Sequence, residues 1–358
     1  MASRPYDTTP ERARKAETFF ARMRDPARAI GNPLTDLLLL WGAPIVVLGI
    51  VLTWLKATEL LAPAEGKQLA ALLFFFATLV TYAHLVAVVP RAYINRDVFE
   101  ANRFRLTVVP VALIVAMLVS PTVFIIAGIV AFFWDVHHSA MQTFGIARIY
   151  EFKAGNGPNW LRKTDLYLNW LLYVGPIFVG ASFLLHTDML SRFAETPLTV
   201  LATAPGYLES GNVILRNSAL ALWAVGIVWA VLNYRNAMAQ GYTPPPQKIA
   251  LIGITGLVTF VAWGFLPPLI AFATINIHHA LQYYVIVWVQ EGDRMTAFSR
   301  LGKRAAFAAF LVFTAVVALG YDFATRMDSH LWLVPFLACS ILHFWYDGFV
   351  WSVRKKSF

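Results

Sequence analysis

Long apolar segments alternate with short polar segments along almost the whole chain after residue 33. Each apolar segment has roughly 17 to 25 residues, which is the length that a helix needs to cross a hydrocarbon layer about 30 Å thick. The segments are continuously apolar and lack the alternation of a barrel strand, so they predict helices. We expect ten helices, at residues 34–61, 69–90, 105–120, 122–147, 165–186, 213–233, 249–265, 268–290, 305–321 and 330–352.

The composition indicates that these helices span a membrane. Hydrophobic residues make up 58% and charged residues 14% of the 358 residues, and the mean hydropathy of +0.60 is far above that of a soluble domain. The expected fold class is an all-α, polytopic transmembrane helical bundle. We predict a single transmembrane domain at 33–358 after a basic cytoplasmic tail at 1–32, with a surface helix near Glu11 to Arg24. The tail lacks the apolar core of a cleavable signal peptide.

The formal charge of +9 comes from basic residues in the polar segments. About 24 of the 29 Lys and Arg lie in the tail, in the C-terminal RKK and in alternate loops at 91–105, 148–163, 235–248 and 294–304. By the positive-inside rule these segments and both termini are cytoplasmic, so even-numbered helices run from the outside inward. We expect a multi-pass protein of the inner, cytoplasmic membrane, with no nucleic-acid partner because no soluble module is basic. The outer segment 187–212 is expected to lie on the surface or re-enter the membrane.

Six of the eight histidines lie in the cytoplasmic halves of four even-numbered helices; they are His84, His137, His138, His278, His279 and His343. Four of them lie seven to twelve residues from the first cytoplasmic charge of their helix, which is a depth of roughly 10 to 18 Å. Ionisable residues are rare inside membranes and usually mark a functional site. We predict that His84, His138, His279 and His343 converge on one buried site.

Polar residues at helical spacing accompany the histidines, because residues three or four apart share a helix face. Asp135 and Asp347 lie three and four residues from His138 and His343, and they complete the predicted set of metal ligands. Adjacent histidines point about 100° apart, so the sequence leaves open which member of each pair is a ligand. Supporting or catalytic roles around the ligands are expected for Gln142, Gln282, Asn276 and Tyr82.

The two histidine pairs occur in similar contexts. "WDVHHSAMQ" at 134–142 and "INIHHALQ" at 275–282 share Asp or Asn, a β-branched residue, His-His and a later Gln. Both helices also begin near proline. The pattern indicates a weak internal repeat of the helix pairs 105–147 and 249–290.

An intramembrane group of histidines suits a metal or cofactor site, a proton or ion pathway, or a structural polar core. Imidazole and carboxylate without thiolate fit iron or zinc, and imidazole also fits copper. Because the histidines and aspartates are enough for two coordination spheres, we expect non-haem iron in a dinuclear centre. The remaining histidines, His186 and His330, lie at outer helix ends and are excluded from the site.

A buried metal site in a membrane suits chemistry on a lipid-like, apolar substrate, because iron with O2 attacks unactivated C–H or C=C bonds. Aromatic residues near the histidines are expected to line its pocket; they are Trp134, Tyr283, Phe344 and Tyr346. The chain has no GxGxxG motif for a flavin or nicotinamide cofactor. Electrons would therefore come from a cytoplasmic electron donor, unless the reaction is a dioxygenation.

These features resemble the integral-membrane, histidine-rich non-haem iron oxygenases, both the desaturase and hydroxylase group and the carotene-cleaving Brp/Blh group. The resemblance rests on "HH" in two helices, on single histidines in "TYAHL" and "LHFWYDG", and on their common depth. It implies a membrane-bound oxygenase or related oxidoreductase with iron at these histidines. The HxxxH and HxxHH boxes of desaturases are absent, which leaves the substrate and the number of metal ions open.

Two other functions stay open at this point. A b-type haem protein also uses histidines at matched depth, and Arg91, Arg148 and Arg354 would pair with the haem propionates. Against it, Asp135 and Asp347 would lie where a porphyrin needs apolar contacts. A proton- or metal-coupled transporter would use the aspartates and histidines as a relay, although its site is expected nearer the membrane midplane.

Overall fold

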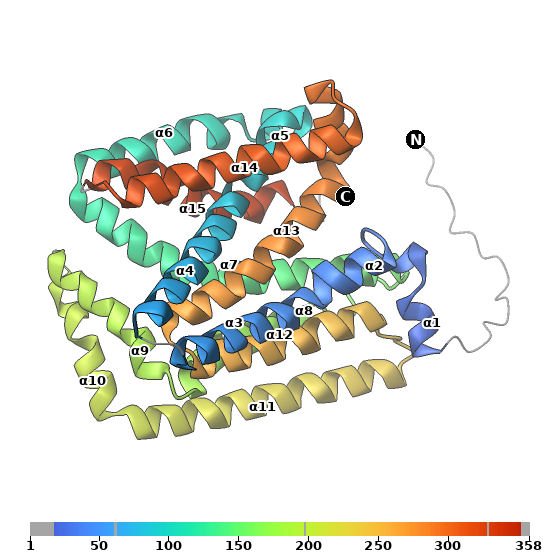
Figure 1. Ribbon diagram of the computed structural model, residues 1–358. Coiled ribbons are helices and arrows are strands. Elements are labelled where there is room, and N and C mark those ends of the chain that lie inside the picture. The colour runs from blue at the N-terminus through green and yellow to red at the C-terminus, as the bar shows by residue number, and fades with distance from the viewer. Residues whose placement is uncertain (1–17, 61–62, 197, 328, 352–358) are drawn as a thin grey trace, which may run out of the picture.

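The computed structural model describes residues 18–60, 63–196, 198–327 and 329–351. Every regular element in these ranges is helical (Figure 1), which confirms the predicted all-α helical bundle. The long helices correspond one to one to the predicted helices; they are α3 (Ala43–Leu60), α4 (Pro63–Leu85), α6 (Arg103–Val119), α7 (Pro121–Lys153), α8 (Arg162–Val179), α11 (Asn212–Ala239), α12 (Pro246–Phe265), α13 (Pro268–Ser299), α14 (Lys303–Thr325) and α15 (His330–Val350).

Short helical elements connect the long ones; they are α1 (Phe19–Met23), η1 (Pro26–Arg28), α2 (Pro33–Thr35), η2 (Asp36–Trp41), η3 (Val86–Val88), η4 (Pro90–Ile94), α5 (Arg96–Ala101), α9 (Phe183–Thr187), η5 (Asp188–Glu195), η6 (Thr199–Thr203) and α10 (Ala204–Ser210). The predicted surface helix coincides in part with α1, while its residues 11–17 and the C-terminal RKK lie outside the described residues. The outer segment 187–212 consists mainly of the short helices η5, η6 and α10.

Eight of the described helical segments are long and apolar enough to cross a membrane. The other two long helices are α6, which has 17 residues, and α8, whose first turns are polar. Large apolar side chains also cover outer faces of the bundle, for example Val225 and Val228 of α11 and Val312 and Val316 of α14. Exposed apolar faces of this kind are stable against lipid rather than water. The chain is therefore a multi-pass membrane protein.

Prolines fix several helix starts. Pro121 and Pro268 occupy the first position of α7 and α13, where the missing N–H removes no helical hydrogen bond. Ser120 caps α7 by accepting a hydrogen bond from the amide of Val123. The two helices end at Lys153 and Ser299, several residues beyond the predicted ends, because helical hydrogen bonding continues past the apolar segment into polar residues.

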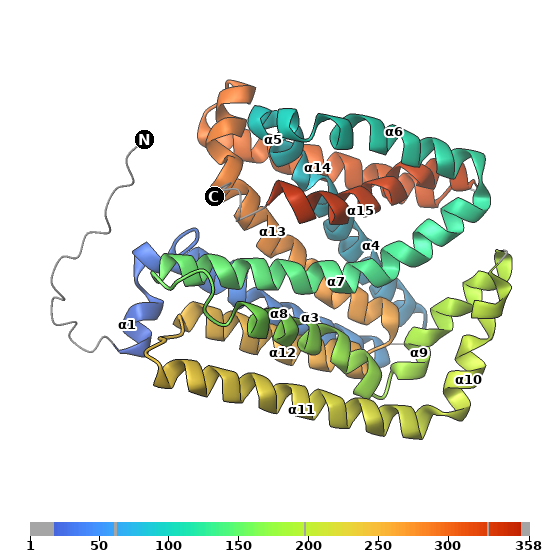
Figure 2. The same ribbon diagram turned by 180° about the vertical axis from the view of Figure 1, so that it is seen from behind.

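Helices α4, α7 and α13 pass between two groups of helices (Figures 1 and 2). Helices α6, α14 and α15 form one group, and α3, α8, α11 and α12 form the other. In the apolar 18-residue stretch of α13, 72% of the residues are buried inside the bundle. The corresponding share in α11 is 6%. Helix α13 is therefore the central element, and polar side chains on it are shielded from lipid.

The bundle has two ends of different character. One end carries α9 and α10 and the connections α6–α7, α12–α13 and α14–α15, and we call it the α10 end (Figure 1). The other end carries α1, α5 and the connections α7–α8, α11–α12 and α13–α14, and we call it the basic end. At the α10 end His186 is buried, with Nε2 2.8 Å from the carbonyl oxygen of Trp263, away from the histidines of the predicted site.

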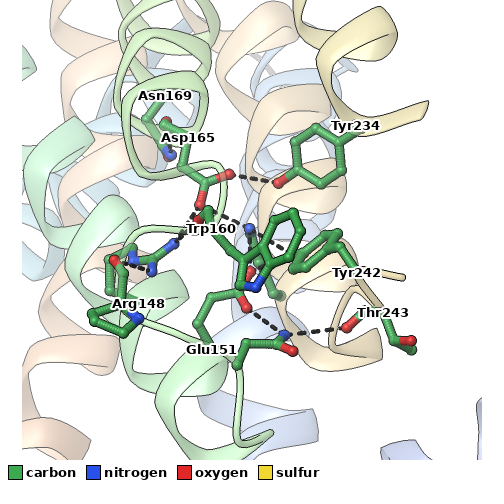
Figure 3. Close-up of polar contacts among 11 residues, drawn as sticks. Arg148, Glu151, Trp160, Asp165, Asn169, Tyr234, Tyr242 and Thr243 are labelled. Carbon is green, nitrogen blue, oxygen red and sulfur yellow. Dashed lines mark hydrogen bonds and ion pairs between the residues drawn. The ribbon is translucent and has the colours of Figure 1, made fainter. Parts of the chain in front are cut away.

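A buried ion network ties α7, α8 and α12 together at the basic end (Figure 3). Lys248 of α12 is fully buried, and its Nζ lies 2.5 Å from Glu151 Oε1, 2.8 Å from Asp165 Oδ2 and 3.1 Å from the Tyr242 hydroxyl. Arg148 Nη1 donates to Asp165 Oδ2 at 2.9 Å. We call this group, completed by Tyr234, the Lys248 network.

The remaining carboxylate oxygens of the Lys248 network also have donors. The Tyr234 hydroxyl donates to Asp165 Oδ1 at 2.6 Å, and Asn156 Nδ2 donates to Glu151 Oε2 at 2.6 Å. The Tyr242 hydroxyl donates to Glu151 Oε1. Two cations thus balance two carboxylates, and each charge is hydrogen-bonded, which is the condition under which buried ions are tolerated.

Candidate metal centre

Four histidines from four helices meet inside the bundle. They are His84 of α4, His138 of α7, His279 of α13 and His343 of α15. The ring centroids of His84 lie 5.1 Å from His279 and 5.0 Å from His343. The ring centroid of His138 lies 4.9 Å from each of the same two. The four imidazoles therefore form a closed ring, as the prediction of convergence required, and we call it the histidine ring.

The spacing of the histidine ring fits the ligation of a single ion. A nitrogen bonded to zinc or iron at about 2.1 Å places the centre of its imidazole about 3.2 Å from the ion. Two imidazoles that subtend about 90 to 110° at the ion then have centres about 4.5 to 5.2 Å apart. The four observed separations fall within this interval. In addition, ligand nitrogens of His84, His279 and His343 lie within 4.8 Å of one another.

The ring nitrogens are buried without hydrogen-bond partners. Both nitrogens of His84 and His279 and the Nε2 atoms of His138 and His343 have no partner among the described residues. The four side chains are between 0% and 4% exposed. Each unsatisfied buried polar group costs about 1–3 kcal/mol. A ligand that accepts nitrogen lone pairs removes this cost at several atoms together, and a metal ion is such a ligand.

A backbone irregularity sets the tautomer of His343. Its Nδ1 lies 3.0 Å from the carbonyl oxygen of Leu85, so Nδ1 carries the proton and Nε2 keeps its lone pair. Leu85 O is available because η3 follows α4, and the amide of Val89 donates to Val86 O, one residue later than in an α-helix. Pro90 comes next and has no N–H with which to continue the α-helical pattern.

Asp347 adds a carboxylate to the histidine ring. Its Oδ2 lies 3.9 Å from His138 Nε2 and 4.0 Å from His343 Nε2. Two ligand atoms bonded at about 2.1 Å to one ion are at most about 4.2 Å apart, so Oδ2 is within reach of an ion held by these histidines. Its Oδ1 accepts hydrogen bonds from the Tyr283 hydroxyl at 2.8 Å and from Trp351 Nε1 at 3.0 Å. These donors orient the carboxylate.

The structure places the second predicted aspartate differently. Asp135 is buried and its Oδ2 accepts a hydrogen bond of 2.9 Å from Asn276 Nδ2. The groups of described residues that can hold an ion do not include Asp135. It lines a cavity next to the histidine ring instead.

The adjacent histidines His137 and His278 lie outside the histidine ring. His137 is half-buried and its ring packs against Trp170 of α8 at 5.1 Å. His278 is fully buried, and no ring contact joins it to the cluster in the described part of the chain. The sequence left open which histidine of each adjacent pair is a ligand. The structure places His138 and His279 in the histidine ring. Corresponding positions of the two motifs also pair across the α7–α13 contact, as a repeat would give: His138 with His279, and Asp135 with Asn276.

The two predicted glutamines connect helices beside the cluster. Gln142 Nε2 donates to the carbonyl oxygen of His279 at 2.9 Å and lies 3.3 Å from Gln282 Oε1. Gln282 Nε2 donates to the carbonyl oxygen of Leu40. Both side chains therefore hold the backbone of α13 against α7 and η2, which is a supporting role.

A cavity of about 550 Å³ lies beside the histidine ring, between α4, α7, α13, α14 and α15. Phe344 lines it, as predicted, and its ring centroid is 4.7 Å from that of His138. The cavity lining does not include the other aromatic residues predicted for a pocket. Trp134 packs behind Phe344, Tyr283 lies against His343 and bonds to Asp347, and the Tyr346 hydroxyl lies 2.9 Å from that of Tyr93.

Tyr82, predicted to support the ligands, lies in the wall of this cavity and stacks on Tyr321, with ring centroids 3.3 Å apart. Further lining residues were not predicted; they include Thr81, Glu195, Phe272, Tyr321, Leu337 and Ser340. Sequence periodicity could have found Ser340, because it lies three residues before His343 on α15. No comparable signal marks Glu195, which belongs to η5.

No protein-family model, curated protein or solved structure matches the chain.

The arginines near the cluster are already paired. Arg91 Nη1 lies 2.5 Å from Glu291 Oε1, and its guanidinium lies over the Trp351 ring at 4.9 Å. Arg148 belongs to the Lys248 network, through Asp165. Arg354 lies outside the described residues.

Proposed function

We propose that this multi-pass membrane protein is a metal-dependent oxidoreductase, a non-haem iron oxygenase that acts on a lipid-like, apolar substrate. The observation that carries the proposal is the histidine ring, whose buried nitrogens have no hydrogen-bond partners among the described residues, next to a cavity of about 550 Å³ with both apolar and polar side chains in its lining. The donor set contains only imidazole nitrogen and carboxylate oxygen. Such sets suit iron, zinc and copper, and exclude metals that need thiolate.

Iron is favoured over zinc because the neighbouring cavity is lined by apolar side chains such as Phe272 and Leu337. A substrate that fits this lining has few polarised bonds for a Lewis acid to activate. Bound non-haem iron would supply the activation of O2 for attack on an unactivated C–H or C=C bond. The surrounding helices exclude water from the reacting groups.

The ligand arrangement supports one ion. The two groups of residues that can hold an ion are His84, His279 and His343, and His138, His343 and Asp347. Both groups need His343, and its Nδ1 is already bonded to Leu85 O, so a single nitrogen is available to both. We therefore propose a mononuclear centre in place of the dinuclear one.

Asp347 supplies the carboxylate ligand in this proposal. Its Oδ2 faces His138 and His343, while its Oδ1 is held by Tyr283 and Trp351 toward the basic end. The Oδ2 atom is therefore held in position to bind the ion together with His138 and His343.

The geometry supports a haem site less well. Axial imidazoles of a bis-histidine haem lie on opposite faces of a porphyrin, and further imidazoles beside them would occupy the plane of the macrocycle. In the histidine ring each imidazole has two others about 5 Å away. The arginines suggested as propionate partners, Arg91 and Arg148, are paired with Glu291 and Asp165.

The test is elemental analysis and an absorption spectrum of the protein purified in detergent. We expect about one iron per chain and no Soret band. A Soret band would favour the haem alternative, and the absence of any bound metal would favour transport. Incubation of iron-loaded protein with apolar lipid extracts and O2, followed by mass spectrometry, then tests for oxygen-containing products that the His343→Ala variant does not form.

Paired histidines provide matched controls. We expect His138→Ala and His279→Ala to lose the ion, and His137→Ala and His278→Ala to keep it, because only the first two belong to the histidine ring. The substitutions are chemically identical and one residue apart, so a general loss of folding would affect both members of a pair. Retention of a full complement of metal in His138→Ala, or equal loss in His137→Ala, would contradict the assignment.

A further inference from the structure

The cavity is elongated, and buried polar side chains lie at the end beside the histidine ring. Its lining on α7 runs from Phe124 to Asp135, and its lining on α15 runs from Leu333 to Phe344. The two ends of each stretch are eleven residues apart in the helix, which is about 17 Å. Phe124 and Leu333 lie near the α10 end, while Asp135 and Phe344 lie beside the histidine ring. An extended molecule therefore fits the cavity with one end at the histidine ring.

Two buried polar side chains occupy the end beside the histidine ring. Asp135 is 2% exposed and Asn276 is 0% exposed, and both line the cavity. The hydrogen bond between them uses Asp135 Oδ2 and Asn276 Nδ2. Asn276 Oδ1 has no hydrogen-bond partner among the described residues. The pair thus contributes hydrogen-bond acceptors to the cavity lining, and within the described part of the chain no donor reaches Asn276 Oδ1.

The position of this pair relative to the ligands follows from helix geometry. Asp135 precedes His138 by three residues on α7, and Asn276 precedes His279 by three on α13. Each acceptor is therefore one helical turn from a histidine of the ring, on the side of the α10 end. A group bound by the pair lies about one turn from the reacting centre.

We propose that the cavity binds an elongated, mainly apolar molecule that carries a hydroxyl group, and that this hydroxyl is bound by Asp135 and Asn276 next to the histidine ring. The proposal rests on the proposed function for the chemistry at the ring, while the binding itself depends only on the cavity and the pair. The apolar remainder of the molecule lies along the cavity toward Phe124 and Leu333. The bond that reacts is then close to the hydroxyl-bearing end, because the opposite end lies about 17 Å away along the helix axes.

A hydroxyl matches this end of the cavity better than an alkyl group. It donates one hydrogen bond to the unpartnered acceptor, and its oxygen can accept one from a hydroxyl in the same wall, such as that of Thr81. An alkyl end would leave Asn276 Oδ1 buried and unpaired, which binding sites penalise strongly. The pair is thus a specificity determinant for the hydroxyl-bearing end.

The test compares two probes of equal length, 1-hexadecanol and hexadecane, with the full-length protein in lipid nanodiscs. Retention of each probe after gel filtration is measured by mass spectrometry. We expect the wild-type protein to retain the alcohol about 10-fold better. In the double variant Asp135→Leu/Asn276→Leu both partners become apolar groups of similar volume, so neither is left unpaired, and we expect the preference to disappear with hexadecane retention unchanged.

Two controls separate the outcomes. Leu337→Trp fills the apolar part of the cavity and should reduce retention of both probes without changing their ratio. The double variant should keep its metal, because neither residue is in a group that can hold an ion. Equal retention of both probes by wild-type protein that carries metal would overturn the inference and leave the proposed function intact. A stronger preference for hexadecylamine than for the alcohol would also overturn it, whereas a preference for the alcohol in a metal-free protein would support it and count against the proposed function.

Discussion

The molecule contains two buried polar clusters, the Lys248 network and the histidine ring. They differ in how many of their polar atoms have a hydrogen-bond partner among the described residues. In the Lys248 network two cations face two carboxylates, and the hydroxyls of Tyr234 and Tyr242 supply further donors. In the histidine ring, six nitrogen atoms have no partner among the described residues. The two clusters lie in the same bundle and are similarly buried. Burial of polar groups alone therefore does not mark a functional site.

The difference lies in what each cluster still needs. A closed network of charges and hydrogen bonds gains nothing from a ligand, and any group inserted into it would break existing bonds. Imidazoles packed edge to edge with free lone pairs are stable only with a species that accepts those lone pairs. The Lys248 network therefore joins α7, α8 and α12, while the histidine ring has the unsatisfied nitrogens that the proposed metal ion would bind.

The largest effect expected is the loss of folding stability when the Lys248 network is opened. Lys248→Met removes the cation shared by Glu151 and Asp165 and leaves buried carboxylates with less compensation, which costs about 3–5 kcal/mol. Denaturant titration in detergent measures this cost, and metal content per folded chain should stay unchanged. Lys303→Met is the control, because its partner Asp293 is exposed and such surface pairs contribute about 0–1 kcal/mol. Equal losses in both variants would remove the contrast.

The next effect concerns metal affinity. Tyr283→Phe deletes the hydroxyl that donates to Asp347 Oδ1, and loss of such an orienting donor lowers metal affinity about 10- to 100-fold. Competition with a chelator measures the change. Tyr284→Phe is the matched control, since its hydroxyl donates to Thr314 Oγ1 on α14. If both variants bind metal as the wild type does, Asp347 is not a ligand.

The smallest effect is expected from a tyrosine-to-phenylalanine substitution in the Lys248 network. Burial and the hydrogen bond to Glu151 raise the pKa of Tyr242 well above its usual value, so its hydroxyl remains a donor. Tyr242→Phe removes that donor, but Lys248 and Asn156 still contact the Glu151 carboxylate. We expect about 1 kcal/mol of lost stability and no change in metal affinity. A loss as large as that of Lys248→Met would mean that the network depends on each member equally.

The sequence predicted the helices because their signal is local. Continuous apolar segments and prolines at helix starts mark the spans, and only the ends of helices such as α7 were placed too early. The histidine ring was predictable as well, because residues such as His84 and His343 repeat one depth across four helices. Depth is a one-dimensional quantity that can be counted along the chain.

What the sequence could not supply is the rotation of each helix. His137 and His138 have the same depth to within one residue, and only the packing of α7 against α8 and α13 separates them. Asp135 had the right spacing for a ligand but faces Asn276 and the cavity. Lys248 and Glu151 are 97 residues apart, and no periodicity links them. The same limit applies to the cavity wall, to which five long helices contribute.

One hydrogen bond of the candidate metal centre has a main-chain acceptor, so truncation of the side chain at the acceptor position does not remove it. The acceptor for His343 Nδ1 is the main-chain oxygen of Leu85, which every residue at that position would carry. Leu85 O is left free for the imidazole by the tightened turn at Val86–Val88, which Pro90 follows. An inventory of ligands compiled from mutant phenotypes would thus find the imidazole and overlook the peptide group that decides where its proton resides.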